Sequence, residues 1–537
     1  MFRPVMKKKS IFRHARLPAA LAGILRITRA QPRRRLAMMA GVCVAALSTL
    51  LFTPDAPRQA TPISSMVIAT ASYGLSANDA QLAQTIFTAQ RRGDFDWADA
   101  LMAQMEDQIL FGHFLAQRYL SAHYDTTKTE LTTWLANFAD QPEAPRIRAL
   151  AQRKGASKAE LAGLPEIASA SLKGDGYVEH LGRRSMPDGF YRGLAHWKER
   201  GYGPAYRAFA DVARQEKLNR WQYSAAHYWA YRAAKKLNDD ASAYAHLQQA
   251  GTAPLTFYGQ LANQQLGNRS AVMAASPSVP SELRAQPAVL RAQALAQAGQ
   301  PELAEETLRL LVMQLDTHER PAVLALAGEF GLANLQVRLG SLEGLSTEEQ
   351  YFARYPMPPW FTARNESVDS ALLLAIARQE SVFRGDAKSH MGATGMMQML
   401  PSTAKHVERR LSAESIALAS NGGNLPLHKQ LDDPSVNIHL GAEYLSILSH
   451  EKAVQQDLIR LIAAYNAGPG SVKNWQTAAR HIDDPLLYIE SIPYPETRNY
   501  VMQVMAHRWV YQTLMGEDAP SLSALAQGQW PKLVARS

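Results

Sequence analysis

The chain has 537 residues, of which 47% are hydrophobic and 20% are charged, a balance typical of folded globular proteins. Its single cysteine, Cys43, excludes an internal disulfide framework and a cysteine-based zinc cluster. The net charge of +9 comes from the N-terminus, because residues 1–35 hold 11 of the 57 Lys and Arg and none of the 48 Asp and Glu. The remainder carries 46 basic against 48 acidic residues, so no nucleic-acid partner is expected.

Residues 1–52 have the pattern of a basic leader. An uncharged stretch, residues 36–52, follows Arg33, Arg34 and Arg35 directly. A positive flank before an apolar segment is typical of an export signal or a signal anchor, with the arginines held in the cytoplasm. We therefore expect residues 1–52 to direct export, and an anchor would associate residues 36–52 with the inner membrane; the alternative is a buried core helix. Residues 53–75, rich in Pro, Ser and Thr, are expected to form a linker.

Residues 76–345 are rich in Ala and Leu and show helical periodicity with almost no alternating strand pattern. Helix hairpins are expected around three turn sequences, at residues 92–94, 238–240 and 298–301. The region has no strict repeat period, so we predict an irregular α-superhelix (solenoid) and an all-α fold. Its aromatic side chains are expected to pack between helices. The region itself indicates no chemistry.

A second domain is expected over residues 346–537, because Pro356, Pro358 and Pro359 interrupt the helical pattern. Residues 370–383 then predict a helix that places Glu380 on the same face as apolar side chains. Burial raises the pKa of a carboxyl group, as a general acid near neutral pH requires. The alternative at this point is a structural ion pair of Glu380 with Arg364 or Arg378.

Two later segments combine glycines with polar and aromatic residues. Residues 389–401 place Gly392 and Gly395 before a Met-Met-Gln sequence, and glycines permit close approach of the backbone to a ligand. Residues 463–470 end one helix and begin another, with Tyr465 and Asn466 at the junction. Each segment alone is equally typical of an ordinary turn or helix cap.

Together these segments resemble the soluble lytic transglycosylase family. The resemblance covers residues 350–515 and depends on motifs in the family's order: Glu380-Ser381 with Phe383, Gly-Met-Met-Gln at 395–398, residues 433–445, Ala-Tyr-Asn-Ala-Gly at 464–468, and residues 492–501. It implies a lysozyme-like α-helical catalytic domain at 346–537. The helical region 76–345 is similar to that family's superhelical domain, although the matching fragments there are short.

The resemblance implies cleavage of the β-1,4 bond between N-acetylmuramic acid and N-acetylglucosamine of peptidoglycan in the periplasm, with a 1,6-anhydromuramyl product. Glu380 falls at the catalytic position, as the single acid and base. The positions implied to line or order the site for glycan strands are Ser381, Ser389, Gly395, Met397, Gln398, Tyr465, Asn466, Glu496 and Tyr500. No metal or organic cofactor is implied.

Two other functions stay open on the sequence. A lysozyme-type hydrolase would use water in place of the muramyl hydroxyl group. A non-catalytic scaffold of the cell envelope would only bind glycan, and a carboxyl group on an apolar helix face argues against it, because binding alone does not require a buried acid. Neither the sequence motifs nor the composition identifies a further partner in the cell wall or in a secretion complex.

Overall fold

The computed structural model describes residues 74–166, 185–268, 273–342, 344–359, 361, 368–419 and 426–533. Every regular element in these ranges is a helix, and β pairing there is limited to isolated bridges such as Thr394 with Met399. The predicted all-α fold class is therefore confirmed. The predicted leader and nearly all of the predicted linker lie outside the described residues. Among the helices that are described, none has both the length and the hydropathy needed to cross a membrane.

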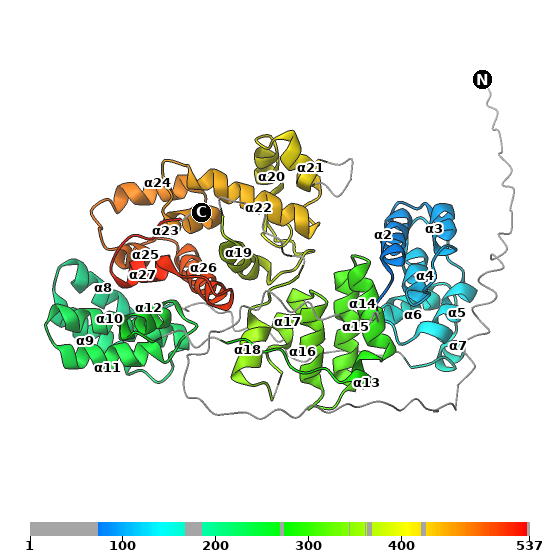
Figure 1. The fold of residues 1–537 in the computed structure, drawn as a ribbon, viewed down its shortest axis with the longest axis horizontal. Helices are drawn as coiled ribbons and strands as arrows, with labels where there is room; N and C mark the ends of the chain where they lie inside the picture. Colours follow the sequence, from blue (N-terminus) through cyan, green and yellow to red (C-terminus); the bar gives the residue numbers. More distant parts are fainter. Residues whose placement is uncertain are drawn as a thin grey trace, which may run out of the picture.

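The N-terminal helices lie at one end of the molecule (Figure 1), where one small core is formed by these helices alone and a second core is shared with helices later in the chain. A helix hairpin joins α2 and α3 through Gly93, which adopts a left-handed φ of 79° at the predicted turn. Thr127 and Ser157 begin α5 and α7 with complete capping boxes, which satisfy the free amide groups of the first turn. The helices are α2 (Ala77–Arg91), α3 (Phe95–Met102), α4 (Phe111–Tyr119), α5 (Lys128–Phe138), α6 (Ala144–Arg153) and α7 (Lys158–Ala162).

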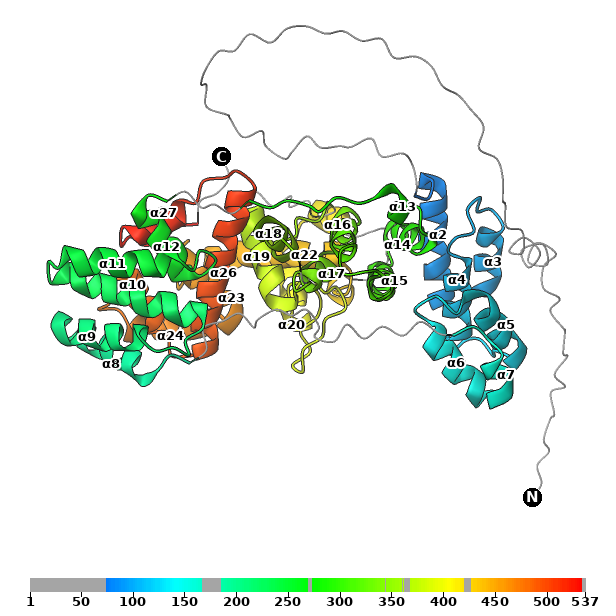
Figure 2. The same ribbon diagram turned by 90° about the horizontal axis from the view of Figure 1, so that it is seen from below.

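The next helices lie at the opposite end of the molecule (Figures 1 and 2). They are α8 (Asp188–Lys198), α9 (Tyr202–Ala213), α10 (Arg220–Lys236), α11 (Asp240–Gly251) and α12 (Phe257–Leu266). Their aromatic side chains pack between helices, as expected: Trp229, for example, is fully buried against Trp197 and Phe209. This group shares one continuous core with the C-terminal helices.

The chain then returns to the N-terminal helices. The returning helices are α13 (Ser281–Arg284), α14 (Pro287–Gln297), α15 (Pro301–Gln314), α16 (Arg320–Glu329), α17 (Ala333–Leu339) and α18 (Thr347–Arg354). The first of them share a core with α2–α4, where the backbone amide of Leu75 donates to Gln297 Oε1 at 2.9 Å. The later ones lead toward the C-terminal helices (Figure 2). All three predicted helix hairpins are present, as α2–α3, α10–α11 and α14–α15.

The C-terminal helices surround α19. They are α19 (Ser370–Ser381), α20 (Pro401–Glu408), α21 (Ala413–Ala419), the 3₁₀ helix η3 (Leu427–Lys429), α22 (Pro434–Ser449), α23 (Leu458–Ala467), α24 (Pro469–Ala478), α25 (Pro485–Glu490), α26 (Pro495–Leu514) and α27 (Pro520–Ala526). Asp369 begins α19 by accepting from the amide of Leu372 and forms a buried ion pair with Arg508 of α26 at 2.9 Å. The start of α19 is thereby fixed against α26.

Helices α8–α12 are docked on α25–α27 by buried contacts. The ring of Phe257 stacks on Trp509 with centroids 5.2 Å apart, and both side chains are fully buried. Tyr258 donates to Glu490 at 2.7 Å, and Gln260 donates to the carbonyl of Ala506 at 3.0 Å. A helix that precedes α19 by more than a hundred residues thus completes the core behind it.

This packing predicts that Phe257→Ala loosens α26. Removing a buried phenylalanine side chain typically costs about 3–5 kcal/mol of stability. Hydrogen exchange of the α26 amides should accelerate in this variant. The matched control is Phe87→Ala, which removes an equally buried ring from the core that α2–α4 share with α13–α18, and should accelerate exchange in that core while leaving α26 unchanged. Unchanged exchange in α26 of Phe257→Ala would contradict the docking.

Candidate active site

Glu380 lies in the last turn of α19, a helix otherwise buried on every side from Ala371 to Arg378. Its side chain is partly exposed, and the hydroxyl of Tyr500 on α26 donates to Oε1 at 2.6 Å. Arg378 points elsewhere: it donates to the carbonyl of Arg354 at 2.8 Å and lies 2.9 Å from His507 Nε2. Arg378 is therefore not the ion-pair partner of Glu380. Arg364, the other partner considered, lies outside the described residues.

The surroundings of Glu380 favour its protonated form. Burial raises the pKa of this carboxyl group from 4.5 to about 7; the negative charge of Glu496 adds to the rise, and the hydrogen bond from Tyr500 opposes it. The pKa values of Tyr465 and Tyr500 lie well above 10, because both phenols are buried near Glu380. Glu380 can thus hold a proton near neutral pH and release it to a base placed within reach.

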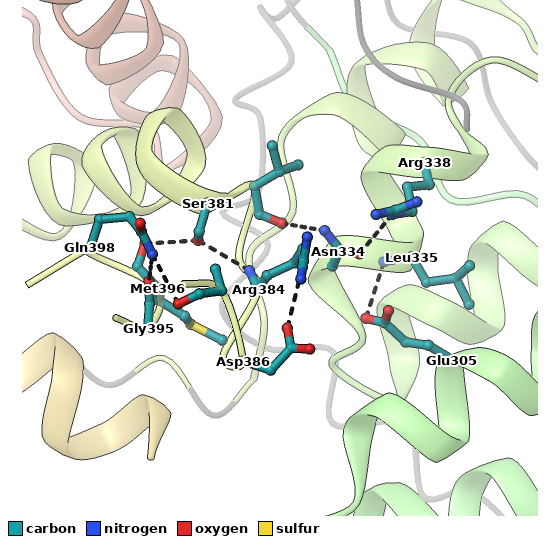
Figure 3. Close-up of polar contacts among 12 residues, drawn as sticks. Glu305, Asn334, Leu335, Arg338, Ser381, Arg384, Asp386, Gly395, Met396 and Gln398 are labelled. Atoms are coloured by element: carbon teal, nitrogen blue, oxygen red, sulfur yellow. Dashed lines mark hydrogen bonds and ion pairs between the residues drawn. The ribbon is translucent and has the colours of Figure 1, made fainter. Parts of the chain in front are cut away.

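The chain turns sharply directly after Glu380 and Ser381. Val382 and Phe383 adopt left-handed φ values of 55° and 63°, a conformation that is costly for residues with a Cβ and rare for β-branched residues. The penalty is roughly 1–2 kcal/mol per residue, so other contacts must hold the turn. Ser381 provides two of them: its hydroxyl donates to the carbonyl of Met396 at 2.8 Å and accepts from the amide of Arg384 at 3.1 Å (Figure 3).

The segment 395–398 packs against this turn. Gly395 has a φ of 81°, and a Cβ at this position would lie 2.2 Å from both Asn437 Nδ2 and the carbonyl oxygen of Leu431. Asn437, fully buried on α22, donates to the carbonyls of Thr394 and Leu431 and accepts from the amide of Met397. The amide group of Gln398 donates to the carbonyls of Ala387 and Gly395. These bonds fix the loop as one rigid unit.

The junction of α23 and α24 completes the site. The hydroxyl of Tyr465 donates to the carbonyl of Met397 at 2.8 Å, which joins α23 to the loop. Asn466 Oδ1 accepts from the hydroxyl of Thr497 on α26 at 2.6 Å. Gly468 has a φ of 82° and separates the two helices, as the sequence predicted.

The residues named from the sequence fall into two sets. Partly or fully exposed side chains that a ligand can reach are those of Glu380, Ser389, Gln398, Tyr465, Asn466 and Glu496. Buried residues that shape the site from behind are Ser381, Gly395, Met397 and Tyr500. The side chain of Met397 is fully buried beside Gly441, and its amide and carbonyl are both bonded within the protein. Ser389 accepts from the amide of Ala393 and so closes its own turn.

Sequence reasoning did not assign two residues whose hydrogen bonds join segments of the site, namely Asn437 and Thr497. Asn437 and Thr497 lie inside motifs that carry the family resemblance, so the signal was available, but their partners are distant in the chain. Among the described residues, no group of three or more His, Cys, Asp or Glu is arranged to hold a metal ion. The chemistry that the site offers is proton transfer to and from the carboxyl group of Glu380, which lies near Tyr465 and Tyr500.

The C-terminal region matches known transglycosylases in sequence. Residues 360–486 match the family model of the transglycosylase SLT domain, and residues 491–520 match that of the soluble lytic transglycosylase helical domain. The soluble lytic murein transglycosylase of Escherichia coli K12 is 36% identical over 164 residues, which are 30% of this chain and 24% of that protein. The membrane-bound lytic murein transglycosylase C of Haemophilus influenzae PittGG is 30% identical over 160 residues, 26% of this chain and 42% of that protein.

The fold resembles a solved structure over a longer range. The crystal structure of the 70 kDa soluble lytic transglycosylase from Escherichia coli superposes with a TM-score of 0.51 over 85% of this chain and 75% of that chain, at 22% identity. The chain spans about a quarter of the length of the soluble relatives that it matches in sequence. The predicted resemblance to the soluble lytic transglycosylase family is thus confirmed, with its sequence support in the C-terminal region.

The geometry of the loop predicts different outcomes for two glycines with nearly the same φ. Gly395→Ala forces a Cβ into Asn437 and Leu431, so the loop should shift, its amides should exchange hydrogen faster and the melting temperature should fall by several degrees. Gly392→Ala, at a φ of 80° with open space around it, adds only the backbone strain and should lower the melting temperature less, with exchange in residues 395–398 unchanged. Equal losses in both variants would mean that the contact with Asn437 has no special role.

Proposed function

We propose that this protein is a peptidoglycan lytic transglycosylase in which Glu380 is the single catalytic acid and base. The observation that carries the proposal is a partly exposed carboxyl group with a pKa of about 7, at the end of a buried helix and inside the segment that matches the transglycosylase SLT domain. The substrate would be the β-1,4 bond between N-acetylmuramic acid and N-acetylglucosamine. The relatives named above are murein transglycosylases, which supports this substrate class.

The first step uses the protonated form of Glu380. Its proton passes to the glycosidic oxygen as the bond from that oxygen to the anomeric carbon breaks, and the N-acetylglucosamine side leaves as an alcohol. The remaining carboxylate then faces the developing positive charge of the muramyl ring. The hydroxyl of Tyr500 stabilises this carboxylate, because it already donates to Oε1 at 2.6 Å.

The second step uses the carboxylate as a base. It removes the proton of the muramyl 6-hydroxyl group, whose oxygen bonds to the anomeric carbon and closes the 1,6-anhydro ring. Glu380 is thereby returned to its protonated form, and no water is consumed. An intramolecular hydroxyl group has a high effective concentration, so no second carboxylate is needed to activate water, unlike in most glycosidases.

The accessible residues of the site are proposed to bind the glycan strand. Gln398 comes from the 395–398 loop, and Tyr465 and Asn466 come from the end of α23. Ser389 lies in the turn before that loop, and Glu496, at the start of α26, is near enough to Glu380 for its charge to raise the pKa of that carboxyl group. The buried residues Ser381, Gly395, Met397 and Tyr500 are proposed to hold these segments and Glu380 in register.

The proposed location is the periplasm. The basic leader at 1–52 supports export, and the substrate class requires contact with the cell envelope. If residues 36–52 are removed, the enzyme is free in the periplasm; if they are retained as an anchor, it is associated with the membrane. The proposed active site is the same in both cases.

Glu380→Gln tests the proposed role directly. The amide keeps the size of the side chain but cannot transfer the proton. Release of anhydromuropeptides should therefore fall by a factor at the upper end of the roughly 10²–10⁴-fold range typical of general acid–base catalysis, or beyond it. The melting temperature should hold or rise, because a buried ionisable group is removed. The matched control is Asp457→Asn, which neutralises another buried carboxyl group of raised pKa while keeping a helix cap, and should retain activity.

Mass analysis of the products distinguishes the alternatives. Anhydro ends and reducing ends differ by one water, so reducing ends from the wild-type protein would indicate a lysozyme-type hydrolase. Glycan binding without any product from the wild-type protein would indicate a scaffold. A Glu380→Gln variant that is active but destabilised by about 3–5 kcal/mol would indicate a structural ion-pair role.

A further inference from the structure

A side chain of the helical region forms a hydrogen bond with the turn at Val382 and Phe383, called the catalytic turn below. Asn334 of α17 donates from Nδ2 to the backbone carbonyl of Val382 at 2.8 Å, across 48 residues of chain (Figure 3). The side chain is buried, with 6% of Asn334 exposed. Val382 is the first left-handed residue after the last turn of α19, two positions beyond Glu380.

The orientation of the Asn334 amide group is fixed by its other neighbour. Arg338, one turn later on α17, donates from Nε to Asn334 Oδ1 at 2.8 Å (Figure 3). A guanidinium group only donates hydrogen bonds, so the oxygen of the amide must face Arg338. The NH₂ group must therefore face the carbonyl of Val382, which can only accept. The position therefore requires a side chain that accepts from Arg338 and donates to Val382, as an amide group does.

The catalytic turn is thus held from two sides. Ser381 ties it to the 395–398 loop, and Asn334 ties it to α17. Helix α17 is itself anchored at its start, where the amide of Leu335 donates to Glu305 of α15 at 3.2 Å. The strained conformation of Val382 and Phe383 needs such support, because neither residue is a glycine.

We propose that Asn334 is a positioning residue of the active site: by holding the carbonyl of Val382 it keeps the turn after α19 left-handed and Glu380 beside Tyr500. The catalytic geometry then depends on α17, a helix outside the segment that matches the transglycosylase domain. This inference rests on the proposed function for its effect on catalysis, whereas its effect on the turn is independent of any activity.

The test compares two buried amide side chains of the same helix. Asn334→Ala removes a hydrogen bond to the catalytic turn, and Gln336→Ala removes one to α18. We expect Asn334→Ala to lower kcat for anhydromuropeptide release by roughly 10- to 100-fold with KM nearly unchanged, because small displacements of a catalytic group have effects of this size. Gln336→Ala should keep kcat within twofold at a comparable loss of melting temperature.

A second substitution tests the mechanism by rescue. Val382→Gly introduces the residue that adopts a left-handed conformation without a steric penalty, so one of the two strained positions is relieved and the turn depends less on the bond from Asn334. Adding it to Asn334→Ala should restore part of the lost kcat. A double variant as slow as Asn334→Ala, or a Gln336→Ala variant that is equally slow, would overturn the proposal.

Hydrogen exchange separates this proposal from the proposed function. The amides of Val382 and Arg384 are bonded within the turn, to Arg378 and Ser381, and should exchange faster in Asn334→Ala but not in Gln336→Ala. If the wild-type protein releases no anhydromuropeptide, the proposed function fails and exchange still decides whether Asn334 holds the turn. Unchanged hydrogen exchange at both amides in Asn334→Ala would refute the proposal that Asn334 holds the turn.

Discussion

The proposed chemistry depends on the desolvation of one carboxyl group, which the surrounding helices keep away from water. An ordinary glutamate would be ionised at neutral pH and could not act as an acid, whereas burial raises the pKa of Glu380 to about 7. Desolvation also has a cost, because it disfavours the charged form that the proposed second step needs. Tyr500 offsets part of this cost with a hydrogen bond to the carboxylate. The two opposing effects place the pKa where one group can both give and accept a proton.

The architecture can be understood as support for that arrangement. Helix α19 is fixed at its start by the ion pair of Asp369 with Arg508, and its end is held by Ser381 and Asn334. Behind it, α26 carries Tyr500 on one side and Trp509 against Phe257 of α12 on the other. Two separate parts of the helical region therefore reach the C-terminal helices, one through α12 and one through α17. The helices before α19 are part of the structure that holds the site.

Local features were predictable from the sequence. The helix expected at 370–383 is observed as Ser370–Ser381, and the hairpin turns at Gly93 and Asn238 are where the glycine and asparagine signals placed them. These predictions succeed because helical periodicity and turn chemistry depend on neighbours in the chain. Glu380 was identifiable for the same reason, as a carboxyl group among apolar residues.

Contacts between distant segments were not predictable. Nothing in the spacing of Phe257 indicates that α8–α12 pack on α26, away from α2–α7. Asn334 reads as an ordinary helical residue, and only the fold shows that its amide group reaches Val382. Arg378, two positions before Glu380, was a reasonable ion-pair partner on proximity alone, yet it faces His507 and Tyr355. In each case the partner is set by packing of helices and not by local sequence.

Titration of the Glu380 carboxyl group itself tests the central claim most directly. Carbon-13 NMR of protein labelled at the glutamate side-chain carboxyl carbons, with Glu380→Gln to assign the signal, reports the pKa without reference to activity. The account predicts a midpoint of about 7. A midpoint near the ordinary value of 4.5 would mean that the group is ionised at neutral pH and would contradict its role as the catalytic acid.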